Sequence, residues 1–206
     1  LVSLMNDPAA WSGDWTLTAD IDLTGKTQSP IGNYETPFTG SFDGAGHTVS
    51  GLHIAAGEAA GLFGVTEGAT VQNLTVTGRA ENTFAAETAE TRVEGRYPGT
   101  GGIVGVALSG TTVENCTSRV SVKGYGNVGG LIGVVYNFGL ATVRIDGCRS
   151  EAAVESLRGN AGGLLGRIYT ASVAFPAVVV SNSVNTADQT LTAEDRNRLG
   201  GIVGYI

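Results

Sequence analysis

Short segments in which apolar and polar residues alternate recur along most of this chain. Four of them are also rich in β-branched residues: 70–76, 112–118, 143–148 and 179–184. A period of two with β-branched residues is typical of half-buried strands. Sustained helical spacing is confined to the first ten residues, where Leu1, Leu4 and Met5 share one face before Pro8. The pattern predicts an all-β protein with a short N-terminal capping helix.

A tetrapeptide of Gly, two apolar residues and Gly occurs five times, at 61–64, 102–105, 130–133, 163–166 and 201–204. Its first glycines are 41, 28, 33 and 38 residues apart. A fixed motif with variable spacing indicates a repeated unit whose loops differ in length. Each unit is too short to bury its apolar face alone, so the units must stack. The leading prediction is a parallel β-helix, a solenoid. A β-propeller is the alternative, but 28 residues are too few for a four-stranded blade.

Stacked units place matched residues about 4.8 Å apart, so like side chains form ladders. We expect one inward ladder from the second residues of the tetrapeptides: Leu62, Ile103, Leu131, Leu164 and Ile202. The motif glycines should either adopt positive φ or lie very close to a neighbouring coil. A Glu- and Arg-rich insertion at 79–99, with weak helical spacing at 84–93, should form a charged surface loop.

The block from Leu17 to Ile54 differs from the repeats but also reads as short strands between Gly turns. It contains Asp20-Ile21-Asp22-Leu23, Pro30-Ile31-Gly32 and the run from Phe38 to His47. With the five tetrapeptides, this block resembles the GLUG-repeat family of bacterial secreted and cell-surface proteins. The resemblance implies a right-handed parallel β-helix in an adhesin-like surface protein, and it carries no catalytic residues to this chain.

The domain prediction is a single β-helix over 1–206. Residues 1–14 would form the N-terminal cap, 15–60 the leading coils and 61–206 the GLUG-type repeat coils. The chain stops inside a tetrapeptide that earlier copies follow with more strand. We therefore expect it to be a fragment of a longer protein, with further coils or domains after Ile206.

Composition narrows the function. The chain has 206 residues, 32 Gly, 12 basic and 19 acidic residues, and a net charge of −7. Its 42% hydrophobic content argues against disorder, and the excess of acid argues against a nucleic-acid surface. No apolar run approaches the roughly 18 residues of a membrane span. The two cysteines cannot build a disulfide framework or a Cys-rich metal site.

Three acidic residues near Gly turns are candidates for metal binding or catalysis: Asp20, Asp22 and Asp43. Such carboxylates could bind Ca²⁺ or act as an acid/base pair on a polysaccharide. The favoured interpretation is that Asp20 and Asp43 shape turns by accepting backbone hydrogen bonds while Asp22 faces solvent. His47 and His53 are the two histidines; for His47 a hydrogen-bonded structural role is favoured.

Two matched pairs stand out in the repeats. Cys116 and Cys148 occupy equivalent positions, and stacked free thiols are favoured over a disulfide. Tyr136 and Tyr169 each follow the first Gly of a tetrapeptide by six residues. An exposed aromatic pair could stack on sugar rings, so these two are the candidate ligand-binding residues, but rim packing on the surface of the helix is the favoured interpretation.

The functional prediction is a structural and binding module of an extracellular bacterial surface protein, adhesin-like, with a glycan or protein partner. The alternative is a β-helical polysaccharide lyase or glycoside hydrolase. We expect no enzyme, no catalytic residues, no cofactor, no metal and no nucleic-acid partner, because no paired-carboxylate, triad or nucleotide-binding motif is present in the sequence.

Overall fold

Three parallel β-sheets form the structure of this chain, a computed structural model that describes residues 1–82, 98–139, 141–170, 178–187, 189–191 and 198–206. Within those residues, each strand pair recorded in these sheets runs parallel. The predicted all-β class with parallel strands is therefore confirmed. Most of the insertion predicted at 79–99 lies outside the described residues.

The sheets are named A, B and C, and their described strands follow. Sheet A contains β1 (Asp14–Thr16), β3 (Ser41–Asp43), β7 (Thr70–Gln72), β11 (Thr112–Glu114), β14 (Val143–Asp146) and β18 (Val178–Ser181). Sheet C contains β6 (Phe63–Thr66), β10 (Val104–Leu108), β13 (Ile132–Asn137), β17 (Leu165–Thr170) and β22 (Val203–Tyr205). Sheet B contains β2 (Ile21–Asp22), β4 (Thr48–Ala56), β5 (Ala59–Ala60), β8 (Thr75–Asn82), β9 (Gly99–Gly101), β12 (Thr117–Gly129), β15 (Arg149–Ser150), β16 (Val154–Gly162), β19 (Val184–Asn185), β20 (Gln189–Leu191) and β21 (Arg198–Gly200).

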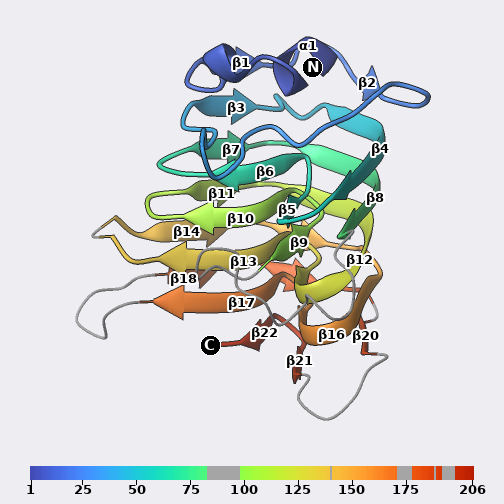
Figure 1. Cartoon of the computed structure of the whole chain (residues 1–206), viewed down its shortest axis with the longest axis vertical. Helices are drawn as coiled ribbons and strands as arrows, with labels where there is room; N and C mark the ends of the chain where they lie inside the picture. The colour runs from blue at the N-terminus through green and yellow to red at the C-terminus, as the bar shows by residue number, and fades with distance from the viewer. Residues whose placement is uncertain (83–97, 140, 171–177, 188, 192–197) are drawn as a thin grey trace.

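The chain visits the sheets in the same order in each turn. Strands β6, β7 and β8 lie in sheets C, A and B, and β10, β11 and β12 repeat that order one layer further along. Figure 1 shows the colour advancing steadily from blue at one end to red at the other, so successive turns stack along the long axis. Matched residues of the repeats therefore lie side by side.

A short helix lies at the N-terminal end of this stack (Figure 1). It is α1 (Val2–Met5), and it buries Leu4 and Met5 as the sequence predicts. A single 3₁₀ turn, η1 (Pro8–Ala10), follows it. The helix is shorter than ten residues because the residue before a proline disfavours helical geometry and proline has no N–H to donate. The indole of Trp11 fixes it by donating to the Leu4 carbonyl at 2.7 Å.

The second residues of the tetrapeptides do form a ladder. The backbone N–H of Leu131 donates to the carbonyl of Leu164 at 3.0 Å, and that of Leu164 to Ile202 at 3.0 Å. The first four ladder residues are completely buried, whereas Ile202 is 39% exposed. Ile202 lies in the last described turn, where no further described strand packs over it.

The motif glycines are explained by close approach and not by positive φ. A Cβ on Gly105 would lie 2.7 Å from the Ala60 nitrogen, and one on Gly133 only 2.2 Å from the Thr100 nitrogen. Neither glycine has a positive φ. In each case the backbone atoms that would clash with the Cβ belong to the segment just before the previous tetrapeptide. The second glycine therefore lets consecutive turns pack at a distance that a side chain would prevent.

The corner between sheets A and B depends on a left-handed residue that the sequence analysis did not single out. Asn73, Asn115 and Asn182 have φ values of 53°, 52° and 50°, and Gly147 has 61° at the same position. Asparagine and glycine tolerate this conformation far better than other residues. The available signal was the recurrence of Asn or Gly inside each of the four alternating segments, between the end of a strand of sheet A and the start of a strand of sheet B.

Among the residues that the structure describes, none of the helices has the length and apolar character that a bilayer crossing needs.

Candidate functional site

The candidate aromatic pair is present, with Tyr136 buried and Tyr169 half-buried. Tyr136 and Tyr169 pair in register in β13 and β17, and their rings stack at 5.1 Å between centroids. Tyr136 is 4% exposed, because its ring packs with Val106 and Val134 on the outer face of sheet C. The matched positions are confirmed, and the burial of Tyr136 agrees with the favoured packing role. Ligand binding by this pair stays a prediction.

Two of the candidate acids shape turns. Asp43 accepts hydrogen bonds from the backbone N–H of Ala45 at 2.7 Å and from the Asn73 amide at 3.0 Å. The pKa of the Asp43 carboxyl is held below its usual value, first by the bond from Ala45 and then by that from Asn73. Asp22 accepts from the backbone of Thr24 at 2.9 Å and is exposed. Both findings match the favoured interpretation.

Asp20 does not shape a local turn, contrary to the favoured interpretation: its partners lie 27 and 28 residues further along the chain, so it joins neighbouring turns. Asp20 accepts from the backbone N–H of Thr48 at 2.8 Å and lies 3.2 Å from Nδ1 of His47. These two contacts, in that order, lower the pKa of Asp20. His47 is thus hydrogen-bonded, as predicted. His53 belongs elsewhere: its Nε2 lies 2.6 Å from Nη2 of Arg79.

The two cysteines are free and buried, as the sequence favoured. Their matched positions place Cys116 beside Cys148 on neighbouring turns, and the backbone N–H of Arg149 donates to the Cys116 carbonyl at 2.8 Å. A hydrogen bond with the Cys148 thiol, together with burial, raises the pKa of Cys116. The two free thiols therefore fill matched buried positions in the core.

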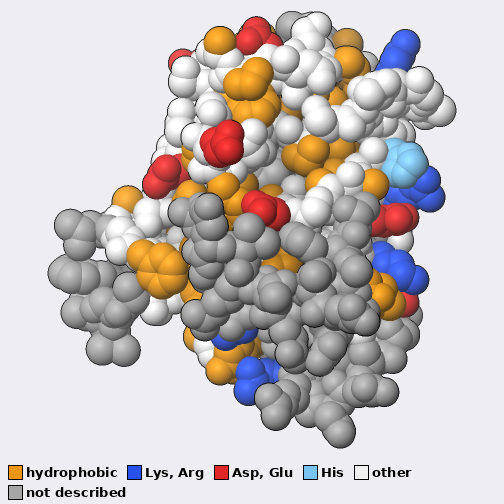
Figure 2. Space-filling view, in the orientation of Figure 1, with side chains coloured by type: hydrophobic (Ala, Val, Ile, Leu, Met, Phe, Trp, Pro, Cys, Tyr) orange, Lys and Arg blue, Asp and Glu red, His pale blue; other side chains and the backbone are white. Residues whose placement is uncertain are grey.

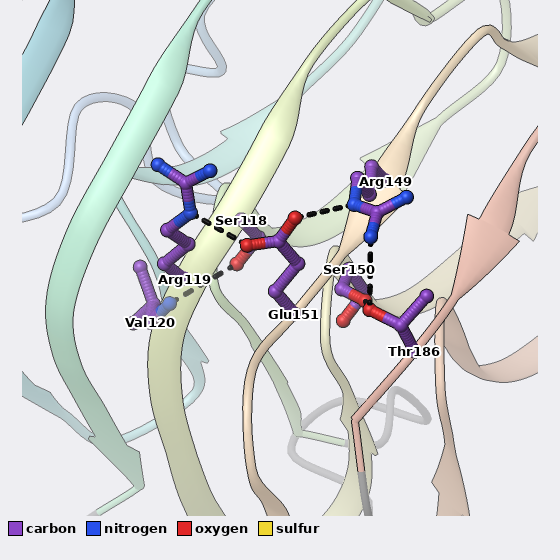
Figure 3. Close-up of polar contacts among 7 residues, drawn as sticks. All are labelled: Ser118, Arg119, Val120, Arg149, Ser150, Glu151 and Thr186. Carbon is purple, nitrogen blue, oxygen red and sulfur yellow. Dashed lines mark hydrogen bonds and ion pairs between the residues drawn. The ribbon is translucent and has the colours of Figure 1, made fainter.

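Sheet B carries charged side chains that join one turn to the next. Figure 3 shows Glu151 between two arginines, with Nε of Arg119 donating at 2.6 Å and Arg149 bonding to the other carboxylate oxygen. These bonds, Arg119 first, lower the pKa of Glu151. Lys123 and Glu155 form a second link between turns at 3.0 Å. The basic side chains of these pairs are exposed and the glutamates are half-buried, so solvent screens the pairs and they stabilise the stack only weakly.

A cleft opens on the same sheet nearer the N-terminus. It encloses about 410 Å³ and is lined by Thr24, Gly25, Lys26, Gln28, Gly51, Leu52, His53, Gly78 and Arg79. Figure 2 shows a histidine beside a basic side chain at the margin of the molecule where β4 and β8 lie in Figure 1. Sequence reasoning missed this site because its residues come from three different turns.

Local irregularities of the chain create this cleft. The pairing of β4 shifts register between Val49 and Leu52, which is a β-bulge next to Gly51. A bulge re-aims the following side chain and interrupts pairing. Gln28 then fixes the geometry: its amide donates to the Gly51 carbonyl at 2.9 Å and accepts from the His53 N–H at 2.8 Å.

Residues 97–123 match the family model described as the GLUG motif. They include the second tetrapeptide and β11. The chain carries a GLUG motif. The predicted resemblance to the GLUG-repeat family is thereby confirmed.

The chain is also similar to halomucin from Haloquadratum walsbyi (strain DSM 16790 / HBSQ001). The two are 33% identical over an alignment of 153 residues, and the match covers 65% of this chain and 2% of halomucin. The chain thus spans about 2% of the length of that curated relative. The GLUG match and this likeness point to an extracellular or cell-surface protein. A bacterial source stays a prediction.

The fold is similar to a solved structure, that of a candidate immunoglobulin A1 protease from Bacteroides ovatus. The TM-score is 0.67 at 20% identity, over 98% of this chain and 68% of that chain. A likeness at such low identity shows the fold alone. It carries no argument about proteolysis by this chain.

Proposed function

We propose that this chain is a segment of a right-handed parallel β-helix that serves as a glycan-binding and structural module of an extracellular surface protein. The repeated order of sheets C, A and B and the parallel pairing support the β-helix. The GLUG motif supports the extracellular setting.

One observation carries the binding role: sheet B presents outward side chains in straight rows. Thr48, Thr75 and Thr117 are paired in register on three consecutive turns. Their neighbours Val49, Val76 and Ser118 point inward and are buried. A polymer with a regular repeat can therefore meet the same side chain at each turn, about 4.8 Å apart.

The polar character of this face favours a glycan over an apolar partner surface. Its outward rows hold threonine, arginine, lysine and glutamate, and the apolar side chains of the same strands face the core. Hydroxyl-rich ligands are recognised by such polar groups, whereas protein interfaces depend on buried apolar or aromatic anchors.

A glycan array probed with the intact 206-residue chain tests the proposal. We expect retention on at least one class of glycan, weakened by Thr75→Glu in the central row of sheet B. Thr112→Glu is the matched control, because Thr112 is an equally half-buried outward residue in sheet A. No retained glycan, or equal loss with both variants, would contradict the proposed function.

A further inference from the structure

The cleft on sheet B has the features of a ligand site that the rows of threonine do not explain. We propose that it binds an acidic sugar unit, whose carboxylate or sulfate group is contacted by Lys26 and Arg79. The inference rests on the proposed glycan-binding function and names the chemistry of the ligand.

Charge is the first argument. The chain has 19 acidic and 12 basic residues, yet the cleft is lined by Lys26, His53 and Arg79 and by no aspartate or glutamate. Among the described residues Lys26 forms no ion pair; the pKa of nearby Asp22 is lowered first by hydrogen bonds from Thr24 and to a smaller extent by Lys26. Two cationic side chains, Lys26 and Arg79, in an otherwise acidic molecule favour a specific anion over general attraction of polyanions.

The guanidinium of Arg79 is held in place by only some of its hydrogen-bond donors. Its Nη2 donates to the His53 ring at 2.6 Å, and its Nη1 lies 3.8 Å from the Glu81 carboxylate, a long contact at the exposed edge. A guanidinium carries five N–H donors in a planar fork. Nε has no partner among the described residues, so donors remain for a planar carboxylate or a sulfate.

The floor of the cleft is made of backbone. Gly51 and Gly78 have φ values of 69° and 138°, and a Cβ on Gly78 would lie 2.2 Å from the Leu52 carbonyl oxygen. Gly25, with a φ of 71°, forms the turn that carries Lys26. Gly51 and Gly78 therefore let the neighbouring turns of the lining pack closely. Its volume of about 410 Å³ falls within the range of roughly 300–1,000 Å³ that is usual for small-ligand sites.

The lining also indicates what kind of molecule bears the anionic group. Leu52 is the one aliphatic side chain of the lining, and it is 2% exposed, so no hydrophobic side chain projects into the cleft as an anchor for a peptide. Thr24, Gln28 and the glycine backbone offer polar groups instead. Sugar hydroxyls beside a carboxylate or sulfate match this combination of hydrogen-bonding groups and cations.

Isothermal titration of the intact chain with three polymers tests the inference: alginate as a carboxylated glycan, dextran sulfate as a sulfated one, and uncharged dextran. The test variant is Lys26→Gln with Arg79→Gln. The control is a chain with Arg144→Gln, which removes an exposed arginine from sheet A. Circular dichroism confirms that each variant is folded.

We expect alginate or dextran sulfate to bind and dextran not to bind, and the double variant to raise Kd about tenfold. The control should change Kd less than about twofold, as expected of a charge remote from the site. Which polyanion binds decides between carboxylate and sulfate. No binding of either polyanion, or equal weakening by double variant and control, overturns the inference. If the array retains a glycan equally well with the wild type and with the Lys26→Gln and Arg79→Gln double variant, the proposed function stands and the cleft assignment fails.

Discussion

Replacing Gly133 with alanine tests the close packing of consecutive turns. A Cβ at this position would lie 2.2 Å from the Thr100 nitrogen and 2.5 Å from the Gly99 carbonyl carbon. Both are backbone atoms of β9, so no flexible side chain can move aside. Van der Waals contact at about 3.5 Å requires the two segments to separate by roughly 1 Å.

The magnitude follows from two opposing effects. Overpacking a well-packed interior costs about 1–3 kcal/mol, and distorted hydrogen bonds of β9 cost roughly 1 kcal/mol more. Alanine in place of glycine returns about 0.4–1 kcal/mol by restricting the unfolded chain. The net loss in free energy of unfolding is therefore about 2 kcal/mol, or a fall in Tm of roughly 4–8 °C for a chain of this size.

Gly201→Ala is the matched control within the same motif. A Cβ there meets no atom within 4 Å, so this variant should be neutral or slightly stabilised. Urea unfolding followed by far-UV circular dichroism compares the two variants with the wild type. A Gly133→Ala variant that unfolds at the same urea concentration as Gly201→Ala would refute the explanation of the motif.

Three further predictions concern the turns and the core. Asn115→Ala should lower the free energy of unfolding by about 1 kcal/mol, because alanine lacks the short polar side chain that makes the left-handed backbone favourable for asparagine. Asn115→Gly, which copies Gly147, should cost little, and equal losses in urea unfolding would contradict this. Cys116 and Cys148 should resist a thiol reagent in the folded chain, because both are buried. Both should react once the chain is unfolded without reductant, and a lack of reaction in the unfolded chain would reveal a disulfide. Asp43→Asn should destabilise the chain at neutral pH. Because the folded pKa of Asp43 is below its usual 3.8, the difference in free energy of unfolding between variant and wild type should fade as the pH drops below 3.8. A difference that stays constant across that pH range would count against the charge effect.

The repeat architecture could be predicted because it depends on features visible within one turn. Alternating strands and the tetrapeptide predicted parallel sheets and a buried ladder, and Leu131 and Leu164 lie where expected. The sequence left open whether the motif glycines need positive φ or close approach. That question depends on the segment one turn away, where Thr100 faces Gly133.

Burial and the cleft could not be predicted for a related reason. Equal spacing placed Tyr136 beside Tyr169, but spacing does not say how deeply the ring packs on the outer face of sheet C. Lys26 and Arg79 come together only because of the register of β4 and the bulge before Leu52. Neither the register of β4 nor the bulge repeats along the chain, so no periodic pattern in the sequence predicts it.

Hydrogen–deuterium exchange of the intact chain, with and without the glycan that it binds, tests most directly the claim that sheet B is the binding face. The account predicts new protection in peptides that cover β4 and β8, with little change in β11 and β14 of sheet A. Protection confined to sheet A, or none in β4 and β8 at saturating glycan, would contradict it.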